Sequence, residues 1–253
     1  MGTATLAAGA SLLVIPALLL FYVGLLFSRR AQTSPEPLML SVFATFWFSG
    51  AFVIATIAMH SILGLFGVLD LSVHRALNYA RTAPLALALW ALLYYLVFLY
   101  TGRRALGVPL AILYAGYFGY LIWYQTTGGP LEISVSDWDV RLSPLEPASS
   151  MRATMYALLF GGPLILATIA YGTLFFGVHE RTARYRIATV TLSFLVLFAC
   201  IMGALLLRLE GEPWFPLTYE VPIVIACVGI VLAYRPPRWV RVHWNLRPME
   251  ASA

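Results

Sequence analysis

The chain has 253 residues, of which 61% are hydrophobic and only 11% charged, and its mean hydropathy is +0.84. Soluble domains are roughly one quarter charged, so this composition excludes a water-soluble globular protein. The formal net charge is +5 and all sixteen basic residues are arginine, which excludes a retinal protein because that chromophore is held by a lysine amine.

Apolar stretches of about the length needed to cross a bilayer fill most of the chain. The first runs from Leu6 to Phe27, and the second from Met39 to Phe66, after the helix-breaking Ser-Pro-Glu-Pro at 34–37. The third spans about Pro84 to Tyr100, and a Thr-Gly-Arg-Arg turn leads to the fourth, from about Leu106 to Tyr124. These stretches predict four membrane-spanning helices.

The longest polar stretch, 125–152, follows the fourth helix. Residues 131–136 within it alternate between apolar and polar, which predicts a short strand or hairpin lying on the membrane surface. Three more helices are predicted after this loop, at about Thr154–Gly177, Ile187–Leu207 and Trp214–Tyr234. The predicted fold class is therefore all-α, a polytopic membrane bundle of seven transmembrane helices over residues 1–234 with a basic tail at 235–253.

The distribution of charge gives the orientation. Eleven arginines and three acids fall in the first, third and fifth loops and the tail, against five arginines and eight acids in the opposite segments. Positive residues near helix ends stay cytoplasmic, so we expect a multi-pass plasma-membrane protein with the N-terminus outside, the hairpin loop extracellular and the C-terminus cytoplasmic. The basic balance then indicates contact with the lipid bilayer and not with nucleic acid.

Tryptophans interleave with the basic residues of the tail. Trp239 and Trp244 alternate with arginines in a pattern typical of a segment lying against anionic headgroups. A surface that docks a partner protein is the alternative interpretation.

The third and fourth helices are rich in aromatic residues. On the fourth, Tyr114, Tyr117, Tyr120 and Tyr124 fall on one stripe. Phenolic hydroxyls in hydrocarbon need partners, so this stripe should face the bundle or a cavity. It indicates either ordinary packing or an aromatic-walled pocket for a lipid, a quinone or another small hydrophobic ligand.

A ligand site is expected in the outer half of the bundle. The fourth helix ends there, directly before the outer loop, and the second helix reaches the same face at His60. The six residues predicted to form the ligand-binding site are His60, Trp90, Tyr94, Tyr120, Trp123 and Trp138.

Signals for metal, haem and catalysis are sparse. His60 and His74 belong to the same face, but no two histidines share a helix at metal-ligand spacing. We therefore predict no metal site and no cofactor, while haem, a quinone or a lipid stays open, with His60 the best-placed haem ligand. No zinc signature, nucleophile elbow or phosphate-binding glycine loop occurs, so no catalytic residue is predicted and nothing nominates an enzyme.

Charged residues are expected at or beyond helix ends. Every Asp, Glu and Arg can be placed there once the seven stretches are assigned. Ion pumps and carriers of charged substrates need such groups at mid-depth, so the pattern disfavours that class.

One resemblance concerns the inner turns. Tyr100-Thr101-Gly102-Arg103-Arg104, the arginine-rich turn at 181–186 and the long outer loop resemble the seven-helix N-terminal sensor region of some histidine kinases. In that family the module senses an extracellular or membrane-borne signal and relays it to a cytoplasmic effector. Nineteen residues after the last helix cannot hold a kinase, so the resemblance implies that a separate protein carries the output.

A second resemblance concerns the outer loop. Trp138-Asp139-Val140-Arg141-Leu142 is similar to the end of the tryptophan-rich loop of haem-handling cytochrome c assembly proteins. That family has several tryptophans flanked by histidine haem ligands, whereas this loop has one tryptophan and no flanking histidine pair.

Three functions follow from these patterns. The first is a seven-transmembrane sensory or hydrophobic-ligand-binding module that signals through a partner membrane protein or cytoplasmic effector. The second is a non-catalytic accessory or assembly subunit of a larger respiratory or haem-handling membrane complex. An enzyme or carrier for a lipid-like substrate is the third.

Overall fold

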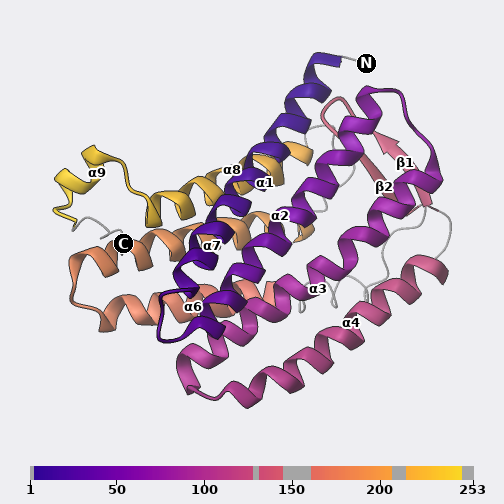
Figure 1. Ribbon diagram of the computed structural model, residues 1–253. Coiled ribbons are helices and arrows are strands. Elements are labelled where there is room, and N and C mark those ends of the chain that lie inside the picture. The colour runs from indigo at the N-terminus through magenta and orange to yellow at the C-terminus, as the bar shows by residue number, and fades with distance from the viewer. Residues whose placement is uncertain (1–2, 128–130, 145–160, 207–214, 247–253) are drawn as a thin grey trace.

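The computed structural model describes residues 3–127, 131–144, 161–206 and 215–246. It is a bundle of long helices with a small hairpin at one end (Figure 1). The long helices are α1 (Thr3–Ala31), α2 (Pro37–Leu65), α3 (Leu71–Thr101), α4 (Gly107–Thr127), α6 (Gly162–Gly177), α7 (Arg181–Leu206) and α8 (Phe215–Tyr234). The shorter elements are the 3-10 turn η1 (Arg104–Leu106), the strands β1 (Leu131–Val135) and β2 (Val140–Pro144), and the helix α9 (Arg238–His243).

The helices have the length and surface of membrane spans. Five segments are long and apolar enough to cross a bilayer, namely Thr3–Ala31, Pro37–Leu65, Leu71–Thr101, Arg104–Trp123 and Arg181–Ala199. Their outward faces carry large apolar side chains, such as Leu18 at 65% exposure and Ile112 at 69%. Such a surface suits lipid and not water, so the chain is a membrane protein.

Two further apolar helical segments, Gly162–Gly177 and Glu220–Tyr234, are shorter. For them the prediction of a full crossing stays a prediction. The fifth predicted helix was expected to start at about Thr154, and its first residues lie outside the described part of the chain.

An aromatic core joins the first three helices. Phe43 of α2 is fully buried, and its ring stacks on Tyr95 of α3 at 4.2 Å between centroids. The ring of Phe27 in α1 meets it edge-on at 4.7 Å. Phe194 of α7 is equally buried in the same cluster. These rings lock α1, α2, α3 and α7 together, because large interlocking side chains supply the dispersion energy that holds membrane helices.

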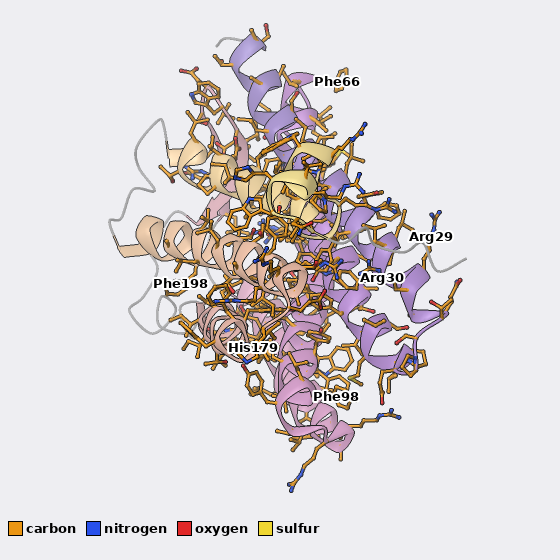
Figure 2. All side chains as sticks on the ribbon, turned by 90° about the vertical axis from the view of Figure 1, so that its left-hand side faces the viewer. Arg29, Arg30, Phe66, Phe98, His179 and Phe198 are labelled. Carbon is orange, nitrogen blue, oxygen red and sulfur yellow. The ribbon has the colours of Figure 1, made fainter. Side chains whose placement is uncertain are left out.

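The two ends of the bundle differ in chemistry. The hairpin end holds the start of α1, the α2–α3 turn and the β1–β2 hairpin, and the arginine end holds the α1–α2, α3–α4 and α6–α7 connections and α9 (Figure 1). Figure 2 labels Arg29 and Arg30, of which Arg29 lies at the edge of the bundle and Arg30 lies closer to its centre. Basic residues thus gather at one end.

The start of α3 departs from the sequence-based expectation. The helix begins at Leu71 and not near Pro84, which lies inside it, so Arg75 and Arg81 are helical residues and not part of an outer loop. A proline removes one hydrogen bond, and a membrane helix tolerates that loss when its neighbours satisfy the freed carbonyl. Asp70 caps the true start, because its side chain accepts a hydrogen bond from the Ser72 N–H at 2.7 Å.

The Asp70 cap leads to the first testable prediction. Hydrogen bonds from the Ser72 hydroxyl and N–H lower the pKa of the Asp70 carboxyl. A lowered folded-state pKa means that the cap stabilises the protein above the unfolded-state pKa and is lost as pH falls through the folded-state value. Asp70→Ala should therefore lower the thermal midpoint at pH 7, and the difference from wild type should vanish in acid. Asp137→Ala, which removes an exposed hairpin acid, is the control and should leave the thermal midpoint equal to that of wild type at pH 7 and in acid.

The sixth predicted helix also starts earlier than expected. α7 begins at Arg181, six residues before the predicted start at Ile187, because a basic first turn is tolerated where its side chains reach water.

The predicted strand at 131–136 forms β1, which pairs antiparallel with β2, with Ile133 opposite Leu142.

Candidate functional site

The hairpin is seated on small residues of α1 and α2. The Val140 N–H donates to the hydroxyl of Ser61 at 3.2 Å, and the Val140 side chain lies against Gly64. On α1, Gly9 faces the backbone carbonyl of Trp138 so closely that a Cβ atom would stand 1.9 Å from its oxygen. The hairpin therefore closes the end of the bundle by backbone contact.

The turn of the hairpin is built around a buried acid. Asp139 is 2% exposed, and its carboxylate accepts a hydrogen bond from the Ser136 hydroxyl at 2.7 Å. The Ser136 oxygen accepts in return from the Asp139 N–H at 3.0 Å. These reciprocal bonds fix the turn and direct the carboxylate toward the bundle interior, where it lies within electrostatic range of Glu220.

Two histidines meet beneath the hairpin. His60 of α2 and His74 of α3 are 3% and 0% exposed, and their Nδ1 atoms are 2.7 Å apart. The Nε2 atom of His74 lies 3.0 Å from the carbonyl oxygen of Val68. Because a carbonyl only accepts, this nitrogen carries a hydrogen, and a neutral His74 has a bare Nδ1. The network thus assigns the hydrogen between the rings to Nδ1 of His60.

This geometry limits how many protons the pair can hold. One added proton fits, because His60 can move its own hydrogen to Nε2 and accept a bond from Nδ1 of His74. A second added proton does not fit, because two imidazolium rings would direct two N–H groups at each other across 2.7 Å. Full protonation must therefore separate the rings.

A seam of buried polar side chains continues from the histidines along α2 and α3. On α3, His74, Asn78 and Thr82 recur every four residues and are all buried. On α2, Thr56 and His60 are also four residues apart and buried. In antiparallel helices whose histidines pair, Thr56 stands level with Asn78. The Oδ1 atom of Asn78 is buried with no hydrogen-bond partner in the described residues.

A buried carboxyl group of α8 lies near the hairpin. Glu220 is 0% exposed, and neither of its carboxyl oxygens has a hydrogen-bond partner among the residues that the structure describes. Glu220 lies within electrostatic range of Asp139 on the hairpin, so two buried carboxyl groups are found at this end of the bundle. We use the name polar cluster for the buried polar side chains at the hairpin end: Asn78, Asp139, Glu220, His60, His74, Ser61 and Thr56.

The structure divides the six predicted ligand-site residues among three places. His60 belongs to the polar cluster, and Trp138 lies in the hairpin above it. The Trp90 indole N–H donates to the Gly107 carbonyl at 3.1 Å, and the ring of Tyr94 packs against the same glycine, which begins α4 at the arginine end. Along α3, Tyr94 is twenty residues from His74, or about 30 Å.

The other two predicted residues lie on α4. The rings of Tyr120 and Trp123 are 6.1 Å apart, and Trp123 is 60% exposed on the outer surface. The predicted residues are thus not gathered into one pocket. The tyrosine stripe does face the bundle as expected, since Tyr114 and Tyr117 are 3% and 5% exposed against α3. The side chain of Tyr124 lies outside the described part.

An apolar groove runs between α3 and α4. Its volume is about 340 Å³, and aromatic and small side chains form its walls: Ala83, Ala86, Leu87, Trp90, Ala111, Tyr114, Ala115 and Phe118. Of the predicted tyrosine stripe, Tyr114 lines this groove. Of the predicted ligand-site residues, Trp90 lines it.

On the sequence, His60 was the histidine best placed to bind a haem iron, and no metal site was predicted. Within residues 3–127, 131–144, 161–206 and 215–246, no group of three His, Cys, Asp or Glu side chains is arranged to hold a metal ion. The prediction concerning haem stays untested.

No protein-family model matches this chain, and a search of curated proteins finds no significant match. The resemblances to the histidine-kinase sensor region and to the cytochrome c assembly loop accordingly stay predictions.

Proposed function

We propose that the chain is a seven-span sensory module of the plasma membrane that takes its input at the hairpin end and acts through a separate partner protein. The distribution of arginines supports an orientation with the hairpin end outside and the arginine end in the cytoplasm. The observation that carries the proposal is the buried His60–His74 pair at the top of the polar seam.

Ionisable groups inside a membrane bundle are costly. A purely structural contact at this position would be made more cheaply by apolar side chains, because each buried polar group loses its hydration. Histidine is also the side chain that changes charge in the physiological pH range. A histidine pair that continues along the seam to an unpartnered Oδ1 atom of Asn78 therefore supports a role in binding protons or a small polar ligand.

The hairpin gives such an input a structural consequence. Ser61, which accepts the Val140 N–H, directly follows His60 in α2. Separation of the two rings would shift the end of α2 relative to α3 and disturb the seat of the hairpin. Proton binding is thereby coupled to the positions of two long helices, whose other ends reach the arginine end.

A second testable prediction concerns this coupling. For the full chain in phospholipid nanodiscs, hydrogen exchange of residues 131–144, corrected for its intrinsic pH dependence, should rise in a step as pH falls from about 6 to about 3. His60→Gln and His74→Gln keep a polar side chain that does not titrate, so each should remove most of the step. His179→Gln, at an exposed histidine of the arginine end, is the matched control and should keep it.

Other charged groups at the hairpin end define the contrary result. Arg81 lies within electrostatic range of His60, and Asp70 lies within electrostatic range of His74. The remaining charged groups at this end are Arg75 on α3, Asp139 and Arg141 on the hairpin, and Glu220 on α8. If both glutamine variants retained the full step, the carboxyl groups would be its source and the histidine pair would not be the sensor.

A second candidate function is an accessory subunit of a larger membrane complex, and α4 favours it. In the described part of the chain, α4 packs mainly on α3, and its outer face exposes Val108, Ile112 and Leu113 beside the small residues Ala111 and Ala115. Small residues let another helix approach closely. The two functions can be separated by purifying the protein in mild detergent and measuring its mass by light scattering. A second chain that co-purifies in stoichiometric amount would support the subunit function, and a chain that purifies alone would support the sensor function.

A further inference from the structure

A small pocket at the arginine end is lined by positive charge. It lies where α7, the end of α8 and the segment after α9 meet, and its volume is about 220 Å³. Three arginines line it, Arg186 of α7, Arg235 directly after α8 and Arg241 of α9, and Thr182 and Tyr185 are also among its lining residues.

A hydrogen bond and a tight turn shape this pocket. The hydroxyl of Tyr185 donates to the Leu232 carbonyl at 3.3 Å and ties α7 to α8. After α9, Asn245 adopts a left-handed conformation with φ of 49°, which asparagine tolerates better than most residues. The chain then turns back, so that Leu246 is buried and closes one wall of the pocket.

In the part of the chain that the structure describes, no ion pair joins Arg186, Arg235 or Arg241 of the pocket to a carboxylate. Arg30 of α1 lies within electrostatic range of both Arg186 and Arg235, which adds a fourth positive charge nearby. Like charges held this close repel, and a bound anion would offset that repulsion.

Phosphate is the anion that matches these groups. Guanidinium presents paired donors whose spacing fits the oxygens of a phosphate group, and several arginines together can surround it. The volume is below the roughly 300 Å³ at which pockets for drug-sized ligands begin. It therefore suits a headgroup or a small phosphorylated compound and not a large organic ligand.

The surroundings point to a lipid as the source of the phosphate. The neighbouring helix α9 exposes Trp239 and Val242, each at 73%, and Trp244, which directly follows this helix, is 58% exposed. Exposed tryptophans mixed with arginines are typical of a segment lying in the headgroup layer of a membrane. Pockets of basic residues beside membrane helices at this level bind the headgroups of anionic lipids.

We propose that this arginine pocket binds the phosphate group of an anionic phospholipid through Arg186, Arg235 and Arg241. The bound lipid holds α7, α8 and α9 together at the arginine end. This inference does not depend on the sensory function, because it rests on a different end of the molecule.

Lipid-dependent thermal unfolding of the full chain tests the proposal. The protein in a non-ionic detergent is titrated with phosphatidylglycerol, with phosphatidylcholine, or with inorganic phosphate. Phosphatidylglycerol should raise the unfolding midpoint, and the other two should not at equal phosphate concentration. In Arg186→Gln and Arg241→Gln, about tenfold more phosphatidylglycerol should be needed for half of the effect, because a charge-assisted hydrogen bond is lost.

Matched controls lie on the same two helices. Arg181→Gln on α7 and Arg238→Gln on α9 remove the same charge from positions outside the pocket and should titrate like wild type. Equal weakening by all four variants would reduce the effect to general surface charge and overturn the proposal. Equal protection by inorganic phosphate would overturn the assignment to a lipid. Arg241 is exposed, so its variant should fold even where Arg186→Gln does not.

Discussion

Replacing Phe43 with alanine should destabilise the bundle by about 3–5 kcal/mol, a typical cost for removing a fully buried phenylalanine. The Phe43 ring is 0% exposed and is enclosed by the rings of Phe27, Tyr95 and Trp47. Its removal leaves a cavity where three helices meet. The free energy of unfolding can be measured in mixed micelles by titration with a denaturing detergent.

Phe52→Ala on the same helix is the matched control for this experiment. Phe52 is 49% exposed on the outer surface of α2, so alanine there removes contacts to lipid and creates no cavity. Its effect should be below about 1 kcal/mol. Comparable losses for the two variants would show that the aromatic cluster around Phe43 does not hold the bundle together.

Gly9→Ala should lower stability and detach the hairpin, although alanine is the better helix former. The added methyl group would overlap the backbone oxygen of Trp138, and backbone cannot move aside as a flexible side chain can. Overpacking of this kind costs about 1–3 kcal/mol. Hydrogen exchange of residues 131–144 should therefore become faster, while the exchange of α6 and α7 should change little.

Gly116→Ala gives the same substitution without the clash. Nothing lies within 4 Å of a Cβ atom built at Gly116, so helix propensity alone should act there, and stability should rise by up to about 1 kcal/mol. The two glycines are thus predicted to respond with opposite signs. A stabilising Gly9→Ala would mean that the hairpin is not seated on α1.

The sequence predicted the helices whose apolar runs are uninterrupted. α2 and α4 begin and end within about three residues of the expected bounds, because polar turns with proline or glycine flank them. α3 starts thirteen residues before its predicted start at Pro84, since Arg75, Arg81 and Pro84 break its apolar run. Asp70 followed by Ser72 was a helix-start signal in the sequence, but hydropathy outweighed it in the prediction.

The polar cluster was only partly predictable. His60 was placed at the correct end of the bundle, and His74 was recognised as lying on the same face. Their contact depends on the rotation of α2 and α3 about their axes, and this rotation is set by packing elsewhere in the bundle. Asp139 and Glu220 were counted among the outer-face acids that lie at or beyond helix ends, whereas Glu220 lies inside α8 and both are buried. A single sequence does not show which polar residues the packing will bury.

The predicted ligand site combined residues by their expected depth in the membrane. Trp90 and Tyr94 were grouped with His60, but α3 is longer than expected and carries them to the level of Gly107. The extra turns at the start of the helix move every later residue toward the opposite face by 1.5 Å per residue. Correct helix starts are therefore needed before residues on different helices can be assigned to one site.

The seat of the hairpin also restricts how the first two helices can turn. Gly9 and Gly64 must each present bare backbone to the same pair of strands, and a rotation of either helix by a quarter turn would bring a bulkier neighbour into that position. Movement at this end is consequently limited to shifts that carry both helices and the strands as one unit. A stimulus that loosens the strands would release the axial rotation of both helices at once.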